Sequence, residues 1–247
     1  MVGMLKVNEI FHSIQGESTH AGRPCVFVRL TGCNLRCTWC DTEYAFFEGR
    51  RMSLDAVVAA VGEFGCRLVE ITGGEPLLQP GAVPLMRALL DAGYEVLVET
   101  GGHVPIDEVP DGVGRIVDVK CPGSGESDRN HWDNLARLRP GDEVKFVLAD
   151  AGDYAWAADV VRRLELDRRA PVLFSPVTGR LAPGDLAGWI LRDRLPVRFQ
   201  IQVHKVLWPD VVRGVCACPG RSCWCRAGWT PRRPSRSRAR LGSGAAR

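Results

Sequence analysis

The fold of this chain is decided by one stretch, Gly32-Cys33-Asn34-Leu35-Arg36-Cys37-Thr38-Trp39-Cys40-Asp41-Thr42. Its three cysteines have the spacing C-x3-C-x2-C and follow an apolar run, residues 26–30, that predicts a strand. In a chain without a secretory leader, such a cluster indicates a metal or redox site rather than a disulfide framework. Polar neighbours surround the cysteines, which argues against the alternative of three core thiols that are close by chance.

The number of cysteines in the stretch narrows the kind of site. Structural zinc closes with four ligands, commonly as two C-x2-C-like pairs. Three thiolates on a [4Fe–4S] cluster leave one iron open to a substrate or cofactor. The pattern resembles the radical S-adenosylmethionine (SAM) superfamily, in which the open iron binds SAM and the reduced cluster cleaves it to a 5′-deoxyadenosyl radical. The resemblance makes Cys33, Cys37 and Cys40 the cluster ligands.

Length, composition and charge describe a globular chain. Its 247 residues are 45% hydrophobic and 25% charged, which fits one domain with a core. An apolar run of about 18 residues and a leader are both lacking, so we expect a soluble, cytoplasmic protein without a membrane partner. Eight arginines and no acid lie between Cys216 and Arg247, which leaves 24 basic against 29 acidic residues elsewhere. The body therefore gives no argument for nucleic-acid binding.

The composition changes near Val215, so we divide the chain into a core domain, residues 1–215, and an Arg/Pro/Cys-rich tail, residues 216–247. The tail holds two C-x-C pairs that could form a second metal site, although this spacing strains a tetrahedral site more than C-x2-C does. Its composition also matches an out-of-frame reading of a GC-rich gene. We interpret it as a disordered or artefactual extension and expect truncation after Val215 to leave activity intact.

Strand and helix patterns alternate about six times along the core, which predicts parallel βα units with right-handed crossovers. This is fewer than the eight units of a closed barrel, and the loops after the strands are polar and Gly-rich. We expect an α/β fold, an incomplete (β/α)6-like radical SAM partial barrel, open on one side and with its chemistry at the carboxyl ends of the strands. The predicted strands are 5–14 (at the edge), 25–30, 68–72, 95–100, 115–119, 143–148, 172–174 and 197–203, and the predicted helices are 53–61 (capped by Ser53), 82–92, 130–138, 153–164 (starting on Asp153) and 186–191.

Further motifs between residues 9 and 209 are similar to the 7-carboxy-7-deazaguanine synthase family. The resemblance implies a carbon–nitrogen lyase of queuosine biosynthesis, a tRNA modification pathway. It abstracts a hydrogen at C6 of 6-carboxy-5,6,7,8-tetrahydropterin, contracts the ring and releases ammonia. It also implies reusable SAM, Mg²⁺, a homodimer and a one-electron reductant of flavodoxin or ferredoxin type. The motifs are Ser13-Ile14-Gln15-Gly16-Glu17, Phe27–Cys37, Cys40-Asp41-Thr42-Glu43-Tyr44-Ala45, Thr72-Gly73-Gly74-Glu75-Pro76, Glu99-Thr100-Gly101-Gly102 and Gln202-Val203-His204-Lys205.

The same resemblance assigns residues to the cofactor. Glycine at position 74 lets a strand end approach the methionine amino group closely, although a plain tight turn is the alternative. Trp39 could instead fill the core, and Lys120 could be a solvated lysine at a strand end. The implied SAM-binding residues are Trp39, Cys40, Asp41, Gly74, Glu75, Asp118, Val119, Lys120 and Ser175.

The pterin needs carboxylate and amide partners for its guanidine-like edge and a cation for its carboxylate. Gln15, Glu17 and Glu99 suit the edge, and Arg29 can bind the carboxylate bidentately, although a charge in an apolar strand is costly unless paired. His204 could donate a hydrogen bond or move a proton, or be a surface histidine. The implied substrate-binding residues are Ile14, Gln15, Gly16, Glu17, Arg29, Thr72, Glu99, His204 and Pro209, with Glu17, Glu99 and His204 as the catalytic ones.

Two of these residues need a comment. The resemblance makes Thr42 a ligand of Mg²⁺, an ion that keeps few protein ligands. From the residues alone, Thr42 is equally well a cap after Asp41. Pro209 corresponds to the chain end of short family members, whereas this chain continues, which puts a role for a terminal carboxylate in doubt.

Two other function classes remain open at this point. An activase that installs a glycyl radical on a partner protein shares C-x3-C-x2-C, but it needs an exposed docking groove and no pterin pocket. A non-enzymatic iron–sulfur electron carrier tolerates four ligands and does not need the loop that follows Thr72. Gln15, Glu17, Arg29 and Glu99 favour the lyase over both.

Overall fold

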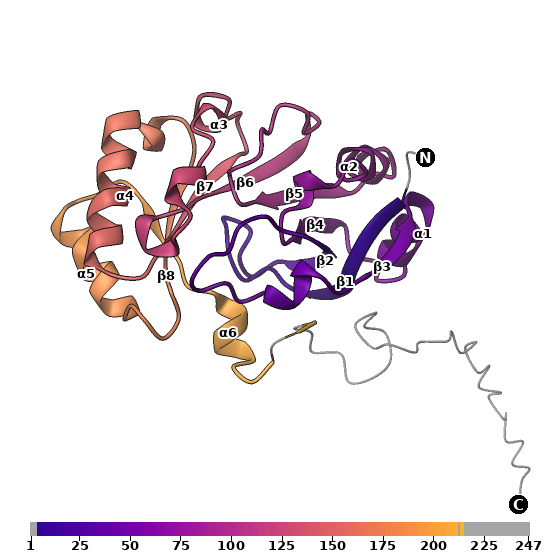
Figure 1. Ribbon diagram of the computed structural model, residues 1–247, viewed down its shortest axis with the longest axis horizontal. Helices are drawn as coiled ribbons and strands as arrows, with labels where there is room; N and C mark the ends of the chain where they lie inside the picture. Colours follow the sequence, from indigo (N-terminus) through magenta and orange to yellow (C-terminus); the bar gives the residue numbers. More distant parts are fainter. Residues whose placement is uncertain (1–3, 212, 215–247) are drawn as a thin grey trace, which may run out of the picture.

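The computed structural model describes residues 4–211 and 213–214, and its centre is a nine-stranded sheet (Figure 1). The tail from residue 216, with its possible second metal site and the truncation prediction, lies outside the described residues. No helix in the described part of the chain has the length and apolar character needed to span a bilayer. The strands are β1 (Met4–Ile14), β2 (Pro24–Leu30), β3 (Arg50–Ser53), β4 (Leu68–Gly73), β5 (Glu95–Thr100), β6 (Val113–Val119), β7 (Glu143–Leu148), β8 (Val172–Pro176) and β9 (Arg198–Phe199).

The sheet has the strand order β3-β1-β2-β4-β5-β6-β7-β8-β9. From β2 to β9 neighbouring strands are parallel, whereas β1 is antiparallel to both β2 and β3. The outermost strands, β3 and β9, do not pair with each other within the described residues, so the sheet does not close. This confirms the predicted incomplete barrel.

Helices cover one face of the sheet, with α1 and α2 beside its first strands and α4 and α5 beside its last (Figure 1). The predicted cap of α1 is confirmed, since the Ser53 hydroxyl accepts a hydrogen bond from the Ala56 N–H at 3.2 Å. No helix lies between β5 and β6. The helices are α1 (Leu54–Gly62), α2 (Ala82–Asp91), α3 (Asp133–Ala136), α4 (Ala151–Leu164), α5 (Pro183–Arg192) and α6 (Val203–Leu207).

Alternation along the strands gives the sheet two different faces. In β4, Val69 and Ile71 pack in the main core with the helices, whereas Glu70 and Thr72 line the interior of the partial barrel. An apolar interior residue is repeatedly followed two positions later by a polar one, as in Leu68 and Glu70. The same sequence occurs in Phe27 and Arg29, Leu97 and Glu99, and Ile116 and Asp118. A small apolar cluster therefore fills the barrel below a layer of charged side chains; it consists of Phe11, Cys25, Phe27, Leu68, Leu97 and Ile116.

The loop between β1 and β2, residues 15–23, lies at the amino ends of the parallel strands because β1 is antiparallel to β2. Arg23 forms an ion pair with Glu95 of β5 at 2.6 Å. The Ser18 N–H donates to the Gln200 side chain at 2.8 Å. This loop therefore connects the first strands to the segment after β9 across the open side of the sheet.

Two predictions about the ends of the core were wrong. Strand β1 is not at the edge, because the short strand β3, which buries only Met52, pairs with it. The last predicted strand, 197–203, shrinks to Arg198–Phe199, and His204 lies in helix α6. The chain leaves the sheet there because the Val203 N–H binds the Gly16 carbonyl oxygen at 3.0 Å, in the loop 15–23.

Two helix boundaries also differ from the prediction. Asp150, rather than Asp153, caps α4 by accepting the Asp153 N–H at 2.9 Å. The Asp153 carboxylate instead accepts the Gly123 and Ala149 N–H groups at 2.8 and 3.0 Å. The helix predicted over 130–138 is limited to Asp133–Ala136.

Candidate active site

A cavity of about 720 Å³ opens inside the partial barrel, and its walls bring together motifs that are far apart in the sequence. Of the predicted site residues, Glu75, Val119 and Ser175 do not line this cavity; the others do. The cavity is lined by Ile14, Gln15, Gly16, Glu17, Arg29, Cys33, Cys37, Trp39, Cys40, Asp41, Thr42, Thr72, Gly74, Glu99, Asp118, Lys120, His204 and Pro209, among others.

The cysteines Cys33, Cys37 and Cys40 all face this cavity, whereas the other described cysteines, Cys25, Cys66 and Cys121, do not line it. Burial raises the pKa of Cys37 to about 11, so iron binding would have to displace a proton there. In the described ranges, no three His, Cys, Asp or Glu side chains converge on a single metal ion. A cubane cluster does not need this, because each thiolate binds a separate iron. The donor set fits a [4Fe–4S] cluster with one open iron.

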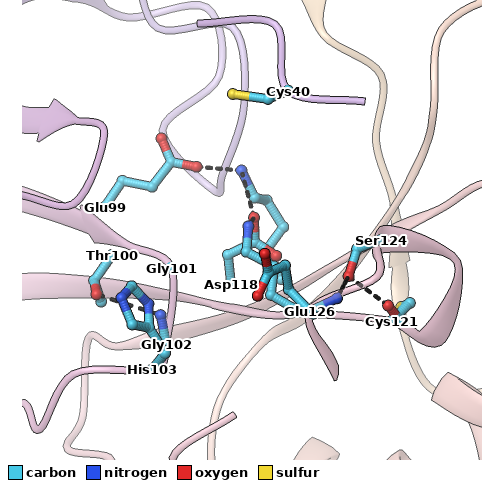
Figure 2. A network of polar contacts seen from close by, with 12 residues as sticks. Cys40, Glu99, Thr100, Gly101, Gly102, His103, Asp118, Cys121, Ser124 and Glu126 are labelled. Atoms are coloured by element: carbon cyan, nitrogen blue, oxygen red, sulfur yellow. Dashed lines mark hydrogen bonds and ion pairs between the residues drawn. The ribbon is translucent and has the colours of Figure 1, made fainter. Parts of the chain in front are cut away.

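The loop that carries the cysteines is fixed to the segment after β6. The Thr38 N–H donates to the Ser124 carbonyl oxygen at 3.0 Å, and the Thr38 hydroxyl donates to the Gly123 carbonyl oxygen at 2.9 Å. The Arg36 N–H donates to Glu126, whose own N–H donates to the Ser124 hydroxyl at 3.1 Å. Figure 2 shows Ser124, Glu126 and Cys121 in this segment, with Cys40 at the top of the view.

Glycines let the carboxyl end of β4 lie directly on the cysteine loop. Gly73 has a φ of +153°, and a Cβ there would stand 2.2 Å from the Leu30 carbonyl oxygen. A Cβ at Gly74 would stand 2.3 Å from the Gly32 carbonyl oxygen and 2.8 Å from the Cys33 Cβ. This close backbone approach leaves exposed main chain beside the cysteines.

The Glu75 side chain points away from the cavity and holds two neighbouring loops together. Its carboxylate accepts the Thr100 hydroxyl at 2.9 Å, the Gly101 N–H at 2.8 Å and the Leu77 N–H at 3.0 Å. Burial raises its pKa, although these hydrogen bonds oppose the shift. Thr100, Gly101 and His103, which lies on the same loop, appear together in Figure 2.

A lysine lines the cavity just after the end of β6. The Lys120 ammonium donates to Asp118 at 2.8 Å. Burial acts to lower the pKa of Lys120, but the attraction of Asp118 outweighs it and the pKa is raised. Lys120 is therefore a paired cavity residue and not a solvated lysine. Val119 instead packs in the main core, and Ser175 is buried in β8.

Arg29, the charged residue inside strand β2, has the ion-pair partner that burial of a charge requires. The Arg29 Nε donates to Glu9 at 2.8 Å, and the Tyr44 hydroxyl donates to the same carboxylate oxygen at 2.9 Å. Arg29 still lines the cavity. It can therefore present guanidinium nitrogens to a ligand while its charge is balanced from behind.

Two charged residues of the interior layer, Glu70 and Lys145, were missed by the sequence analysis. Lys145 donates to Glu17 at 3.0 Å and to Glu99, and the Gln15 amide donates to Glu70. Each carries a charge between two apolar neighbours inside a strand, as Arg29 does, and this costly placement is the signal that could have found both.

His204 closes the cavity from helix α6 and rests on Gly16. A Cβ at Gly16 would stand 2.3 Å from the His204 Nδ1, so the contact requires glycine. Burial lowers the pKa of His204, although Glu17 opposes the shift. The ring is therefore neutral at pH 7, able to donate from one nitrogen and accept at the other.

The residues on both sides of the third cysteine, Cys40, also line the cavity. Asp41 pairs with Lys205 at 2.8 Å, and this attraction outweighs burial and lowers the pKa of Asp41. The Thr42 hydroxyl lies 3.8 Å from the Cys40 Sγ. Trp39 is half-buried, with the Arg180 guanidinium 5.6 Å from its ring centre, so it does not fill the core.

Comparisons with known proteins agree with this geometry. Residues 27–116 match the radical SAM superfamily. Over 226 residues the chain is 47% identical to 7-carboxy-7-deazaguanine synthase of Koribacter versatilis, a match that covers 85% of this chain and 100% of the relative. It is also 47% identical to 7-carboxy-7-deazaguanine synthase of Chlorobaculum tepidum, which covers 85% of this chain and 97% of that protein.

A comparison with solved structures also gives a match that covers most of both chains. The crystal structure of QueE from Escherichia coli covers 81% of this chain and 95% of its own, with a TM-score of 0.68. At 23% sequence identity, this similarity supports the fold alone.

Proposed function

Because the chain belongs to the 7-carboxy-7-deazaguanine synthase family of radical SAM enzymes, we propose that it converts 6-carboxy-5,6,7,8-tetrahydropterin to 7-carboxy-7-deazaguanine and ammonia. The observation that carries this proposal is the cavity itself, where three free cysteines share one space with a layer of charged side chains. An electron carrier needs no such ligand cavity, and an activase needs an open groove for a protein loop.

As a radical SAM enzyme, the chain uses a [4Fe–4S] cluster and SAM, which together supply the radical that abstracts a hydrogen atom from the substrate. Cys33, Cys37 and Cys40 would hold the cluster through their thiolates. The main chain at Gly73 and Gly74 and the pair Asp118–Lys120 offer hydrogen-bonding groups to SAM. Val119, Ser175 and Glu75 would have to reach SAM through main-chain atoms, because their side chains do not line the cavity.

The charged layer suits the two ends of the pterin. Arg29 presents a guanidinium to the substrate carboxylate, a geometry that permits bidentate binding. Glu17 and Glu99 are acceptors for the N–H groups of the guanidine-like edge, with Gln15 beside them. His204 is positioned to accept or donate a proton at the same cavity, and Ile14, Gly16, Thr72 and Pro209 complete its walls.

The proposal extends to a divalent metal and to partners of the enzyme. Thr42 would give one oxygen to Mg²⁺, with the substrate carboxylate and waters as its other ligands, because this ion keeps few protein ligands. A flavodoxin- or ferredoxin-type reductant and a homodimer stay predictions from the family resemblance.

The experiment that tests the function is anaerobic reconstitution with iron and sulfide, followed by dithionite, SAM, Mg²⁺ and the pterin. Formation of a product with deazapurine absorbance, together with one ammonia per turnover, supports the lyase. Cleavage of SAM to 5′-deoxyadenosine without conversion of the pterin favours the activase. A reduced cluster that does not cleave SAM favours the electron carrier.

A further inference from the structure

Three acidic side chains of the cavity lie close to the ammonium group of one lysine, Lys145. The Lys145 Nζ lies 3.0 Å from Glu17, binds Glu99 and lies 3.9 Å from Asp118. Lys145 itself is only 5% exposed. Glu99 and Asp118, both labelled in Figure 2, approach Lys145 from the strands β5 and β6.

The groups that meet at Lys145 come from separate parts of the fold. Glu99 lies on β5 and Asp118 on β6, opposite Lys145 in the strand register, whereas Glu17 belongs to the loop 15–23. Strand β7 binds this loop a second time, through Glu143, which accepts the Thr19 N–H at 3.0 Å. Lys145 therefore helps to fix the position of the Glu17 carboxylate, which lies on a loop, relative to that of Glu99, which lies on a strand.

The charge balance of the interior depends on the same ammonium. Two further cations that line the cavity are paired elsewhere, Lys120 with Asp118 and Arg29 with Glu9. Burial acts to raise the pKa of Glu17, but Lys145 and the Gln202 amide, which donates at 2.8 Å, outweigh it and the pKa is lowered. Without the Lys145 ammonium, the carboxylates of Glu17 and Glu99 would repel each other, and both would repel a charged Glu70, in the same cavity.

We propose that Lys145 is the positioning residue of the pterin subsite, which holds Glu17 and Glu99 side by side as paired acceptors for the N–H groups of the substrate's guanidine-like edge. The inference rests on the proposed function, since it assumes a ligand with adjacent N–H donors. It assigns Lys145 no contact with reacting atoms. Its effect is on the affinity for the pterin, through the two carboxylates.

The test compares Lys145→Met, which keeps most of the length of the side chain without its charge, with Lys145→Arg, which keeps the charge in a larger side chain. Both are reconstituted as full-length holoenzyme. We expect KM for the pterin, and its Kd by anaerobic equilibrium dialysis, to rise about tenfold or more in Lys145→Met. In Lys145→Arg the increase is smaller. Iron content and SAM cleavage without pterin stay at the wild-type level.

A matched control changes a buried strand cation that lies away from the cavity. Arg115 on β6 is 2% exposed and pairs with Asp142, and neither residue lines the cavity. Arg115→Lys lowers the melting temperature because it loses the fork geometry, but it leaves KM and Kd for the pterin unchanged. If Lys145→Met does not fold, Lys145→Gln replaces it in the comparison.

Two results would overturn the inference. One is wild-type KM and Kd for the pterin in folded Lys145→Met. The other is the reverse order, with Lys145→Arg more impaired than Lys145→Met, because a residue that only fills space is sensitive to size and not to charge. A wild-type enzyme that cleaves SAM but leaves the pterin unchanged would instead contradict the proposed function.

Discussion

Gly74 lies so close to Gly32 that a Cβ at position 74 would stand 2.3 Å from the Gly32 carbonyl oxygen. Gly74→Ala would therefore push the carboxyl end of β4 away from the cysteine loop. We expect this variant to be destabilised by about 1–3 kcal/mol and to lose most of its SAM cleavage after reconstitution. Thermal unfolding and 5′-deoxyadenosine formation measure the two effects.

The matched control for this change is Gly188→Ala in helix α5, where a Cβ would have no neighbour within 4 Å. Alanine is favoured over glycine inside a helix, so this variant should gain up to about 1 kcal/mol and keep full activity. Equal loss of SAM cleavage in both variants would contradict the steric explanation for Gly74.

Removal of a cluster cysteine gives the second prediction. Cys40→Ala should lose most of the bound iron and the visible absorbance of the reconstituted enzyme, because two thiolates hold the cluster poorly. Cys66→Ala, at a described cysteine that does not line the cavity, should keep the iron content of the wild type. Iron retention by Cys40→Ala together with iron loss by Cys66→Ala would reassign the ligands.

The third prediction concerns the pH dependence of stability. Burial raises the pKa of Glu70 well above 4.5, and the charges of Glu99 and Glu17 raise it further. A raised carboxyl pKa favours the folded state fully below the unfolded value, and this contribution is lost as the pH rises through the folded pKa. Glu70→Gln, which keeps a hydrogen-bonding partner for Gln15, should therefore melt increasingly higher than wild type as the pH rises from 5 to 8. A difference in melting temperature that does not change with pH would contradict a raised pKa.

The fourth prediction separates the divalent metal from the cluster. Thr42→Ala should need about tenfold more Mg²⁺ for half-maximal pterin turnover, because one of the few protein ligands is lost. Treatment of the wild type with EDTA should stop pterin turnover and leave SAM cleavage intact. An unchanged Mg²⁺ requirement in Thr42→Ala would contradict a role of Thr42 as a ligand of the ion.

The sequence was sufficient for the parts of the fold that follow from local patterns. Strand β5 has the predicted limits, Glu95–Thr100, because a run of strand-forming apolar residues, Val96–Val98, ends shortly before the glycine pair Gly101-Gly102. Arg29 was assigned from the family resemblance, and its charge in an apolar strand was noted only as a cost; the same observation, made for every strand, would have found Glu70 and Lys145.

Other features depend on contacts that no local pattern contains. The end of the sheet at Phe199 follows from the hydrogen bond between Val203 and Gly16, which are distant in the sequence. The orientation of Glu75 follows from the N–H groups of Gly101 and Leu77, and motif matching alone would place this carboxylate in the cavity. A motif therefore predicts where the backbone lies better than where each side chain points.

The loop 15–23 has a consequence for how the protein is made. Glu17 is joined to Gln202 across 185 residues of chain, so the chamber that protects the cysteines is complete only when nearly all of the core has left the ribosome. The cysteine loop leaves the ribosome about 160 residues before Gln202 does, so its thiols are not yet covered by the complete cavity during that interval. Delivery of iron after release, rather than during translation, is the order of maturation that this architecture favours.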